Sequence, residues 1–156
     1  MGYVEEIRAL VGHRPLILVG AVAVIVNEEG KILLQQRKHP EGAWAIPGGL
    51  MELGESVEET AKREVCEETN LTIGELHLIN VYSGPGQFLR APNGDEFYAV
   101  TIAFYTQDYS GELRIDAEES LDFKFFHPNE FPDRIVNSHQ TILQEFLEKK
   151  YYQYIR

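Results

Sequence analysis

The sequence contains a single cysteine, Cys66, and no long hydrophobic run. One cysteine excludes an intramolecular disulfide, so the fold cannot depend on a disulfide framework. The longest apolar segment, Leu16–Val26, is interrupted by Gly20 and is far too short to span a bilayer. The N-terminus also lacks the basic and then apolar segments of a secretory signal. We therefore expect a cytoplasmic protein that does not cross a membrane.

Positive charge is scarce as well, because 14 lysines and arginines face 25 aspartates and glutamates, for a net charge of −11. This balance excludes a broad basic face that would bind the backbone of a nucleic acid. It still allows one small phosphate compound, because a bound metal ion can supply the missing positive charge. The acidity is concentrated between Gly49 and Leu71, where seven glutamates against Lys62 and Arg63 leave a net charge of −5.

The length of 156 residues, with 44% hydrophobic and 25% charged residues, fits one globular domain over residues 1–156. Apolar residues at helical spacing predict an N-terminal helix over about 3–11 and a C-terminal helix over about 136–149. Segments rich in β-branched and aromatic residues predict strands at Leu16–Val26, Lys31–Arg37, Trp44–Ile46, Leu76–Ser83, Glu96–Thr106, Glu112–Ile115 and Leu121–Phe126. Strands on both sides of a central helix, without regular βαβ repetition, indicate an α/β (α+β) fold.

The central helix has clear end signals. Ser56 is a good N-cap and Glu59 follows three residues later, which is the pattern of a capping box. The helix should end at about Thr69, with Asn70 in the left-handed conformation. Before it lies Pro47-Gly48-Gly49, which we expect to be a loop whose backbone a ligand or a metal ion can approach closely.

Three glutamates, Glu64, Glu67 and Glu68, project from one face of this helix, because at 100° per residue they span an arc of about 100°. Like charges at this spacing repel one another, and the helix itself offers no compensation. Mg²⁺ would compensate, since it takes carboxylate oxygens and binds beside substrate phosphates. A solvated acidic face is the alternative for such a cluster. The glycine-rich segment that precedes the helix favours a site for a metal ion and a phosphate group.

The segment Gly49–Leu71 resembles the Nudix box, whose pattern is G-x5-E-x7-R-E-U-x-E-E-x-G-U, with U a bulky aliphatic residue. Eight of its nine specified positions match, and the match ends in the run Arg63-Glu64-Val65-Cys66-Glu67-Glu68-Thr69-Asn70-Leu71. The departure is Asn70, which stands where the family has glycine. Asparagine is the next best residue for left-handed geometry at a helix end, so the acidic face is unaffected. The resemblance implies an α/β/α sandwich with a mixed central sheet.

It also implies an enzyme that hydrolyses the phosphoanhydride of a nucleoside diphosphate linked to another group, with Mg²⁺ or Mn²⁺ as cofactor. The metal ligands that it implies are the carbonyl oxygen of Gly48 and the carboxylates of Glu64, Glu67 and Glu68. Arg63 would orient these carboxylates, and Glu55 would support the loop–helix geometry or a second metal ion. A metal ion neutralises the diphosphate and acidifies a water, and a nearby carboxylate removes the proton of that water.

The general base is left open between Glu67, the first candidate, and Glu119 in a later loop, where plain loop acidity is an equal alternative. Arg37 and Lys38 end the second strand just before the glycine segment and could contact phosphate, although a solvated pair explains them equally well. The five histidines, at positions 13, 39, 77, 127 and 139, do not have the spacing of metal ligands.

We expect ADP-ribose or a nucleotide-sugar-like compound as the substrate, with a long loop over residues 83–96 on the substrate side. A nucleoside triphosphate pyrophosphohydrolase that clears damaged nucleotides is one alternative. A Nudix-fold nucleotide-binding regulator without catalysis is another, but it should lack some metal carboxylates, and this sequence keeps all three. By analogy with the family, a homodimer is expected in which the N-terminal helix packs across or is exchanged. Neither a nucleic acid nor a membrane is expected as a partner.

Overall fold

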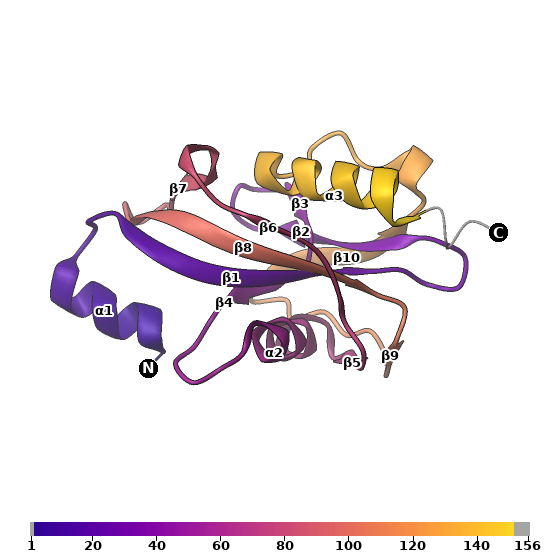
Figure 1. Cartoon of the computed structure of the whole chain (residues 1–156), viewed down its shortest axis with the longest axis horizontal. Helices are drawn as coiled ribbons and strands as arrows, with labels where there is room; N and C mark the ends of the chain where they lie inside the picture. Colours follow the sequence, from indigo (N-terminus) through magenta and orange to yellow (C-terminus); the bar gives the residue numbers. More distant parts are fainter. Residues whose placement is uncertain (1, 152–156) are drawn as a thin grey trace.

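A computed structural model describes residues 2–151 as two helices on opposite faces of twisted sheets, with a third helix at one end (Figure 1). The elements are α1 (Tyr3–Val11), β1 (Leu16–Ile25), β2 (Ile32–Arg37), β3 (Trp44–Ala45), β4 (Gly48–Leu50), α2 (Val57–Thr69), β5 (Thr72–Ile73), β6 (His77–Tyr82), η1 (Pro85–Gln87), β7 (Phe88–Arg90), β8 (Glu96–Thr106), β9 (Tyr109–Ser110), β10 (Ser120–Phe126), η2 (Pro128–Glu130) and α3 (Asn137–Lys149). The domain expected over residues 1–156 includes Met1 and residues 152–156, which lie outside the described residues.

The central sheet is mixed. Its strands follow the order β4-β1-β8-β6, and β7 pairs with β8 as well. β1 and β8 are parallel over their whole length, whereas β4, β6 and β7 run antiparallel to the strand that each of them pairs with. A second sheet of order β10-β2-β3 is antiparallel, and β5 pairs with β9. The connection from β1 to β8 therefore carries the central helix, as parallel strands require a crossover.

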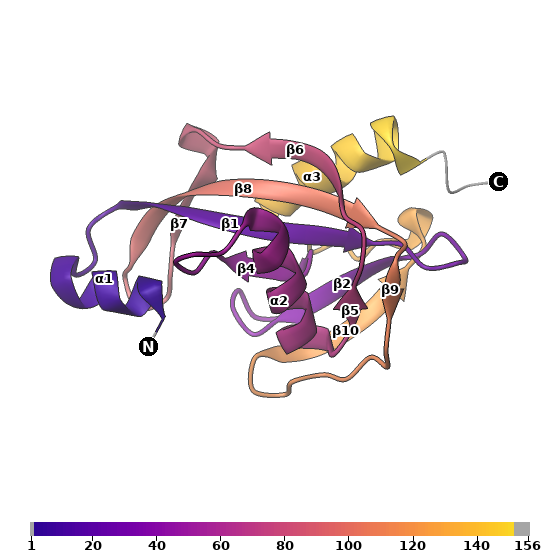
Figure 2. The ribbon, with the colours of Figure 1, turned by 60° about the horizontal axis from the view of Figure 1, so that its bottom comes forward.

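Alternating residues of β1 build two cores, one on each face of the sheet. Val24 packs with Ile142 and Phe146 of α3 on one face, whereas Ile25 packs with Val65 of α2 on the other. Figure 2 shows α2 in front of the strands and α3 behind them. β1 thus has a long buried run because both of its faces are covered. This α/β/α sandwich with a mixed sheet is the predicted fold class.

The three predicted helices are confirmed. α1 has the predicted bounds, and α3 begins one residue later than predicted. α2 begins after Ser56, whose side chain accepts from the Glu59 N–H while the Glu59 carboxylate accepts from the Ser56 N–H, so the capping box is present. Asn70 ends the helix at φ 68°, in the left-handed conformation that the sequence predicts. No helix in the described part of the chain is long and apolar enough to cross a membrane.

The prediction that Pro47-Gly48-Gly49 is a loop was wrong for its glycines. Gly48 and Gly49 belong to β4, where they lie opposite Val22 and Ala21 of β1. A Cβ atom on Gly48 would overlap the carbonyl oxygen of Ala21, so only glycine permits this close pairing. The glycines therefore serve a tight strand contact here, although the same residues usually indicate a turn.

The strand predicted at Glu112–Ile115 was also wrong, because the strand in this region is β9, which lies just before it. Gly111 turns the chain at φ +100° after β9. The backbone beyond this turn then bonds to the end of α2: the Asn70 side chain donates to the Glu112 carbonyl, and the Arg114 N–H donates to the Thr69 carbonyl. These bonds to a helix end replace a strand ladder.

The long loop expected over residues 83–96 contains more structure than predicted. It holds the short helix η1, and β7 returns along β8 with Phe88 opposite Tyr98 and Arg90 opposite Glu96. The rings of Phe88 and Tyr98 contact each other, with 5.2 Å between their centroids. Three residues are too few to show a strand period in the sequence, so β7 is visible only through its partner.

Candidate active site

Arg63 bonds to acidic side chains from just before α2 and from its second half. Its Nε and Nη2 donate to Glu55 at 2.5 and 3.0 Å, and its Nη1 donates to Glu64 at 2.9 Å and to Glu67 at 3.3 Å. A further bond from Nη2 to the Leu50 carbonyl, at 3.1 Å, ties the same side chain to β4. The pKa of Glu55 is lowered to about 2, mainly by its bond with Arg63. A planar guanidinium with several donors thus fixes three carboxylates at once.

Glu68 lies deeper, between α2 and the sheets, and is only 7% exposed. Its carboxylate accepts from the Gly48 N–H and from the Gln35 side chain, both at 3.0 Å. Burial raises the pKa of Glu68 to about 8, and the charge of Glu64 acts in the same direction. A nearby cation would relieve this cost, because it stabilises the ionised carboxylate.

Glu64 lies against Gly49 of β4. A Cβ atom on Gly49 would overlap the Glu64 carboxylate, so the absent side chain is what makes room for that group. Burial raises the pKa of Glu64, and the charges of Glu67 and Glu119 act in the same direction. By donor type, this carboxylate and its acidic neighbours suit Mg²⁺ or Mn²⁺, which prefer carboxylate and carbonyl ligands.

The carboxylates bond to Arg63 and to the backbone rather than to one common point. Among residues 2–151, no three His, Cys, Asp or Glu side chains are arranged together in a way that could hold a metal ion. Glu64 and Glu67 share Arg63 Nη1, while Glu68 bonds to Gly48 and Gln35. Rotation of the long glutamate side chains would therefore accompany metal binding.

Four of the predicted residues line one cavity of about 470 Å³ beside this network. They are Arg37, Lys38, Glu68 and Glu119. The Arg37 guanidinium also lines a second cavity with Gly48 and Gly49, and it has no hydrogen bond or ion pair to another described residue. Burial lowers the pKa of Arg37, and the charge of Glu68 opposes this shift. The structure therefore places Arg37 at the junction of the two cavities.

Glu55 lies apart from these cavities, bonded to Arg63, Thr60 and the Glu52 N–H.

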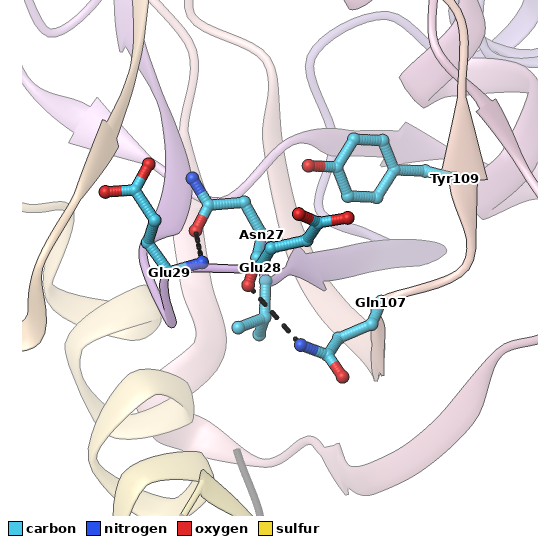
Figure 3. A pocket seen from close by; sticks show the side chains of 6 residues that line it. Asn27, Glu28, Glu29, Gln107 and Tyr109 are labelled. Carbon is cyan, nitrogen blue, oxygen red and sulfur yellow. Dashed lines mark hydrogen bonds between the residues drawn. The ribbon is translucent and has the colours of Figure 1, made fainter. Parts of the chain in front are cut away.

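A hollow of about 550 Å³ lies elsewhere, at the turn after β1 (Figure 3). Its polar groups close the turn: the Asn27 side chain accepts from the Glu29 N–H, and Gln107 donates to the Asn27 carbonyl. None of the predicted site residues lines it. This hollow is therefore separate from the candidate site.

Three polar residues next to the site were missed by sequence reasoning. Gln35 donates to Glu68 and also to the Ser120 hydroxyl, at 2.7 Å, and both side chains are buried. His139 of α3 lines the cavity that contains Gly48, and its Nδ1 accepts from the Ile46 N–H at 2.9 Å. A glutamine inside an apolar strand segment is the one signal that could have indicated Gln35, since a buried polar side chain needs a partner.

The two glycines of β4 allow a matched test. Gly49→Ala should displace the Glu64 carboxylate and lower kcat/KM by about 100-fold, because small displacements of positioned groups have effects of this size. The protein should keep its melting temperature, since the end of a long side chain can move away. Gly48→Ala should instead lower the free energy of unfolding by about 3 kcal/mol, because its Cβ meets fixed backbone.

Steady-state kinetics and urea unfolding of both variants check this pair. Equal losses of stability, or full activity in Gly49→Ala, would contradict the position assigned to Glu64.

The acidic helix α2 packs on a glycine strand beside an arginine-lined cavity in an α/β/α sandwich, and this arrangement suits the class of hydrolases that act on phosphoanhydrides. The chain belongs to the Nudix family within this class, because the family model described as NUDIX domain matches residues 17–146. It is a Nudix-type pyrophosphohydrolase, and enzymes of this family need a divalent metal ion.

Individual relatives agree with this assignment. An ADP-ribose pyrophosphatase of Methanocaldococcus jannaschii is 36% identical over 139 residues, which cover 86% of this chain and 78% of that protein. An NAD-capped RNA hydrolase NudC of Photorhabdus laumondii is 31% identical over 86% of this chain, which spans about half (46%) of that relative. The crystal structure of a MutT NUDIX hydrolase from Burkholderia pseudomallei superposes with a TM-score of 0.68 at 27% identity, covering 83% of this chain and 98% of that one.

Proposed function

We propose that this Nudix hydrolase cleaves the diphosphate of ADP-ribose or of a similar nucleotide sugar, with Mg²⁺ or Mn²⁺ as cofactor. The position of Arg37 carries this proposal: its guanidinium, which bonds to no other described residue, lies where the acidic cavity meets a second, mostly apolar one. A substrate with a charged middle and a ring at one end fits such a pair of cavities. The similarity to the Methanocaldococcus jannaschii ADP-ribose pyrophosphatase supports this choice of substrate.

Different residues of the chain bind the phosphates and hold the metal ion in this proposal. Arg37 and Lys38 bind phosphate oxygens, and Glu64, Glu67 and Glu68 are the carboxylates that would hold the metal, together with the Gly48 carbonyl. When bound, a divalent cation supplies the charge that neutralises the diphosphate and acidifies a water.

Proton transfer and positioning fall to the remaining site residues. Glu67, whose side chain is 57% exposed, is open to solvent and takes the proton of the attacking water, with Glu119 as the alternative base. Arg63 and Gln35 hold the carboxylates in place, as groups beside metal ligands commonly do.

A substrate panel tests the proposal. ADP-ribose, nucleotide sugars, dinucleoside polyphosphates, nucleoside triphosphates and coenzyme A are each incubated with Mg²⁺ or Mn²⁺, and the products are separated. We expect the highest kcat/KM for ADP-ribose, which yields AMP and ribose 5-phosphate. Preferred release of pyrophosphate from a triphosphate would instead identify a triphosphate pyrophosphohydrolase. Turnover of none of these compounds would favour a binding module without catalysis.

Two further expectations stay predictions. One is a homodimer formed through α1, none of whose residues is buried within the described part of the chain. The other is a cytoplasmic location.

A further inference from the structure

The second cavity beside the site, of about 160 Å³, has the size of one flat ring system rather than of a whole nucleotide. Small side chains of the central sheet, among them Gly20 and Ala99, line it together with the apolar Leu89 and Phe97. A wall of this kind accepts a flat group, because small residues leave space over the strands and Leu89 and Phe97 offer apolar contact to its faces. Arg37, which lines both cavities, would hold the phosphates of the same molecule.

His139 is a polar side chain in this cavity that the proposed hydrolysis does not use. It is 7% exposed, and its Nδ1 accepts a hydrogen bond from the Ile46 N–H. A backbone N–H can only donate, so Nδ1 carries the lone pair and Nε2 carries the proton. Among residues 2–151, no group accepts a hydrogen bond from this Nε2–H. The bond to Ile46 thus leaves a fixed donor at the cavity that has no partner among the described residues.

We propose that His139 reads the base of the substrate, by donating its Nε2–H to an acceptor ring nitrogen of an adenine that lies in this cavity. This inference rests on the proposed function, since it assigns one end of the proposed substrate to a defined place. Besides His139, the polar side chains that line the cavity are Arg37 and Thr101, so all three offer donors and none is a carboxylate. Such a lining matches the acceptor nitrogens of a purine.

The charge state of His139 suits this role. Burial lowers its pKa to about 3, and the neighbouring positive charge of Arg37 acts in the same direction. The imidazole therefore stays neutral at physiological pH, and its proton stays on the nitrogen away from Ile46. A buried donor left unpaired by the wrong base is costly, which is how one hydrogen bond gives selectivity.

Analogues that lack one acceptor at a time provide the test. ADP-ribose is compared with its 1-deaza, 3-deaza and 7-deaza adenine forms, in which one ring nitrogen is replaced by C–H. The native enzyme should lose about tenfold in kcat/KM on one of the three. His139→Asn keeps an acceptor for the Ile46 N–H but lacks the distal donor. The kcat/KM of this variant on ADP-ribose should be about tenfold below that of the native enzyme. Its kcat/KM on the analogue that the native enzyme disfavours should be no lower than on ADP-ribose.

His139→Gln is the matched control, because it keeps a distal N–H but gives up the bond to Ile46. It should be less stable than the native protein and should still distinguish ADP-ribose from the same analogue. Equal kcat/KM of the native enzyme on all four compounds, or additive losses of variant and analogue, would overturn the proposal.

A binding measurement separates this inference from the proposed hydrolysis. In metal-free buffer, ¹⁵N-labelled histidine reports the Nε2–H of His139, and its resonance should shift on addition of AMP but not of ribose 5-phosphate. This shift should appear even if the substrate panel finds no hydrolysis of ADP-ribose. An unmoved resonance at saturating AMP would show that His139 only ties α3 to Ile46, and would overturn the assignment.

Discussion

Glu68→Gln should lower kcat by about a thousandfold, and Glu67→Gln should do the same. Both changes keep the side-chain volume and remove one negative charge, so they weaken a site whose hard cation needs carboxylate ligands. Of the two variants, Glu68→Gln should lose more metal affinity, because the Glu68 carboxylate is fixed in place by Gly48 and Gln35 before any metal binds. The measurements are kcat with ADP-ribose and Mn²⁺ affinity from electron paramagnetic resonance.

Glu58→Gln is the matched control for this pair. Glu58 lies in the first turn of the same helix and is exposed, so its variant should keep native turnover and metal affinity. Near-native rates in both Glu67→Gln and Glu68→Gln would remove the role proposed for the acidic face of α2.

The stability of the protein should change with pH in a way that depends on His139. Its pKa of about 3 in the folded protein lies well below the ordinary value of 6.5. Below pH 6.5 the unfolded chain binds a proton that the folded protein cannot bind until pH 3, so acidification favours unfolding. The full effect is about 5 kcal/mol, at roughly 1.4 kcal/mol for each pH unit.

Glu68 changes the stability with pH in the opposite direction, since its pKa of about 8 in the folded protein lies above the ordinary value of 4.5. Between these values the folded protein binds the extra proton, so acidification there favours folding. The two effects overlap, and therefore the difference between native protein and His139→Asn is the informative quantity. Relative to the native protein, the free energy of unfolding of His139→Asn should rise by about 2 kcal/mol as the pH falls from 7 to 5.

Urea unfolding at pH 7, 6 and 5 in the presence of EDTA measures this difference. Parallel curves for His139→Asn and the native protein would show that His139 is not held neutral by burial.

Much of the site could be predicted from the sequence because its information is local. Ser56, Glu59 and Asn70 set the bounds of α2, and the helical period then places Glu64, Glu67 and Glu68 on one side. The same reasoning failed for β4, since its glycines owe their conformation to β1, a distant partner in the chain. Local pattern and long-range pairing favour different structures for a glycine pair, and the pairing prevails.

The residues that sequence reasoning missed depend on long-range contacts. Gln35 meets Ser120 across 85 positions, and His139 meets Ile46 across 93. Neither pair has a spacing that a helix or a strand would repeat. Their partners are therefore known only once the sheets and α3 are in place.

The parallel pairing of β1 with β8 also bears on how the protein forms. It joins Leu16 to Phe97 and Ile25 to Thr106, so the middle of the sheet cannot close before both segments have been synthesised. Such distant contacts slow folding, because loop entropy is lost before they form. The helix that carries the acidic face can form early from its own capping signals. Glu119, Ser120 and His139 join it only from the last third of the chain, so a nascent chain has its acidic helix well before it has a complete candidate site.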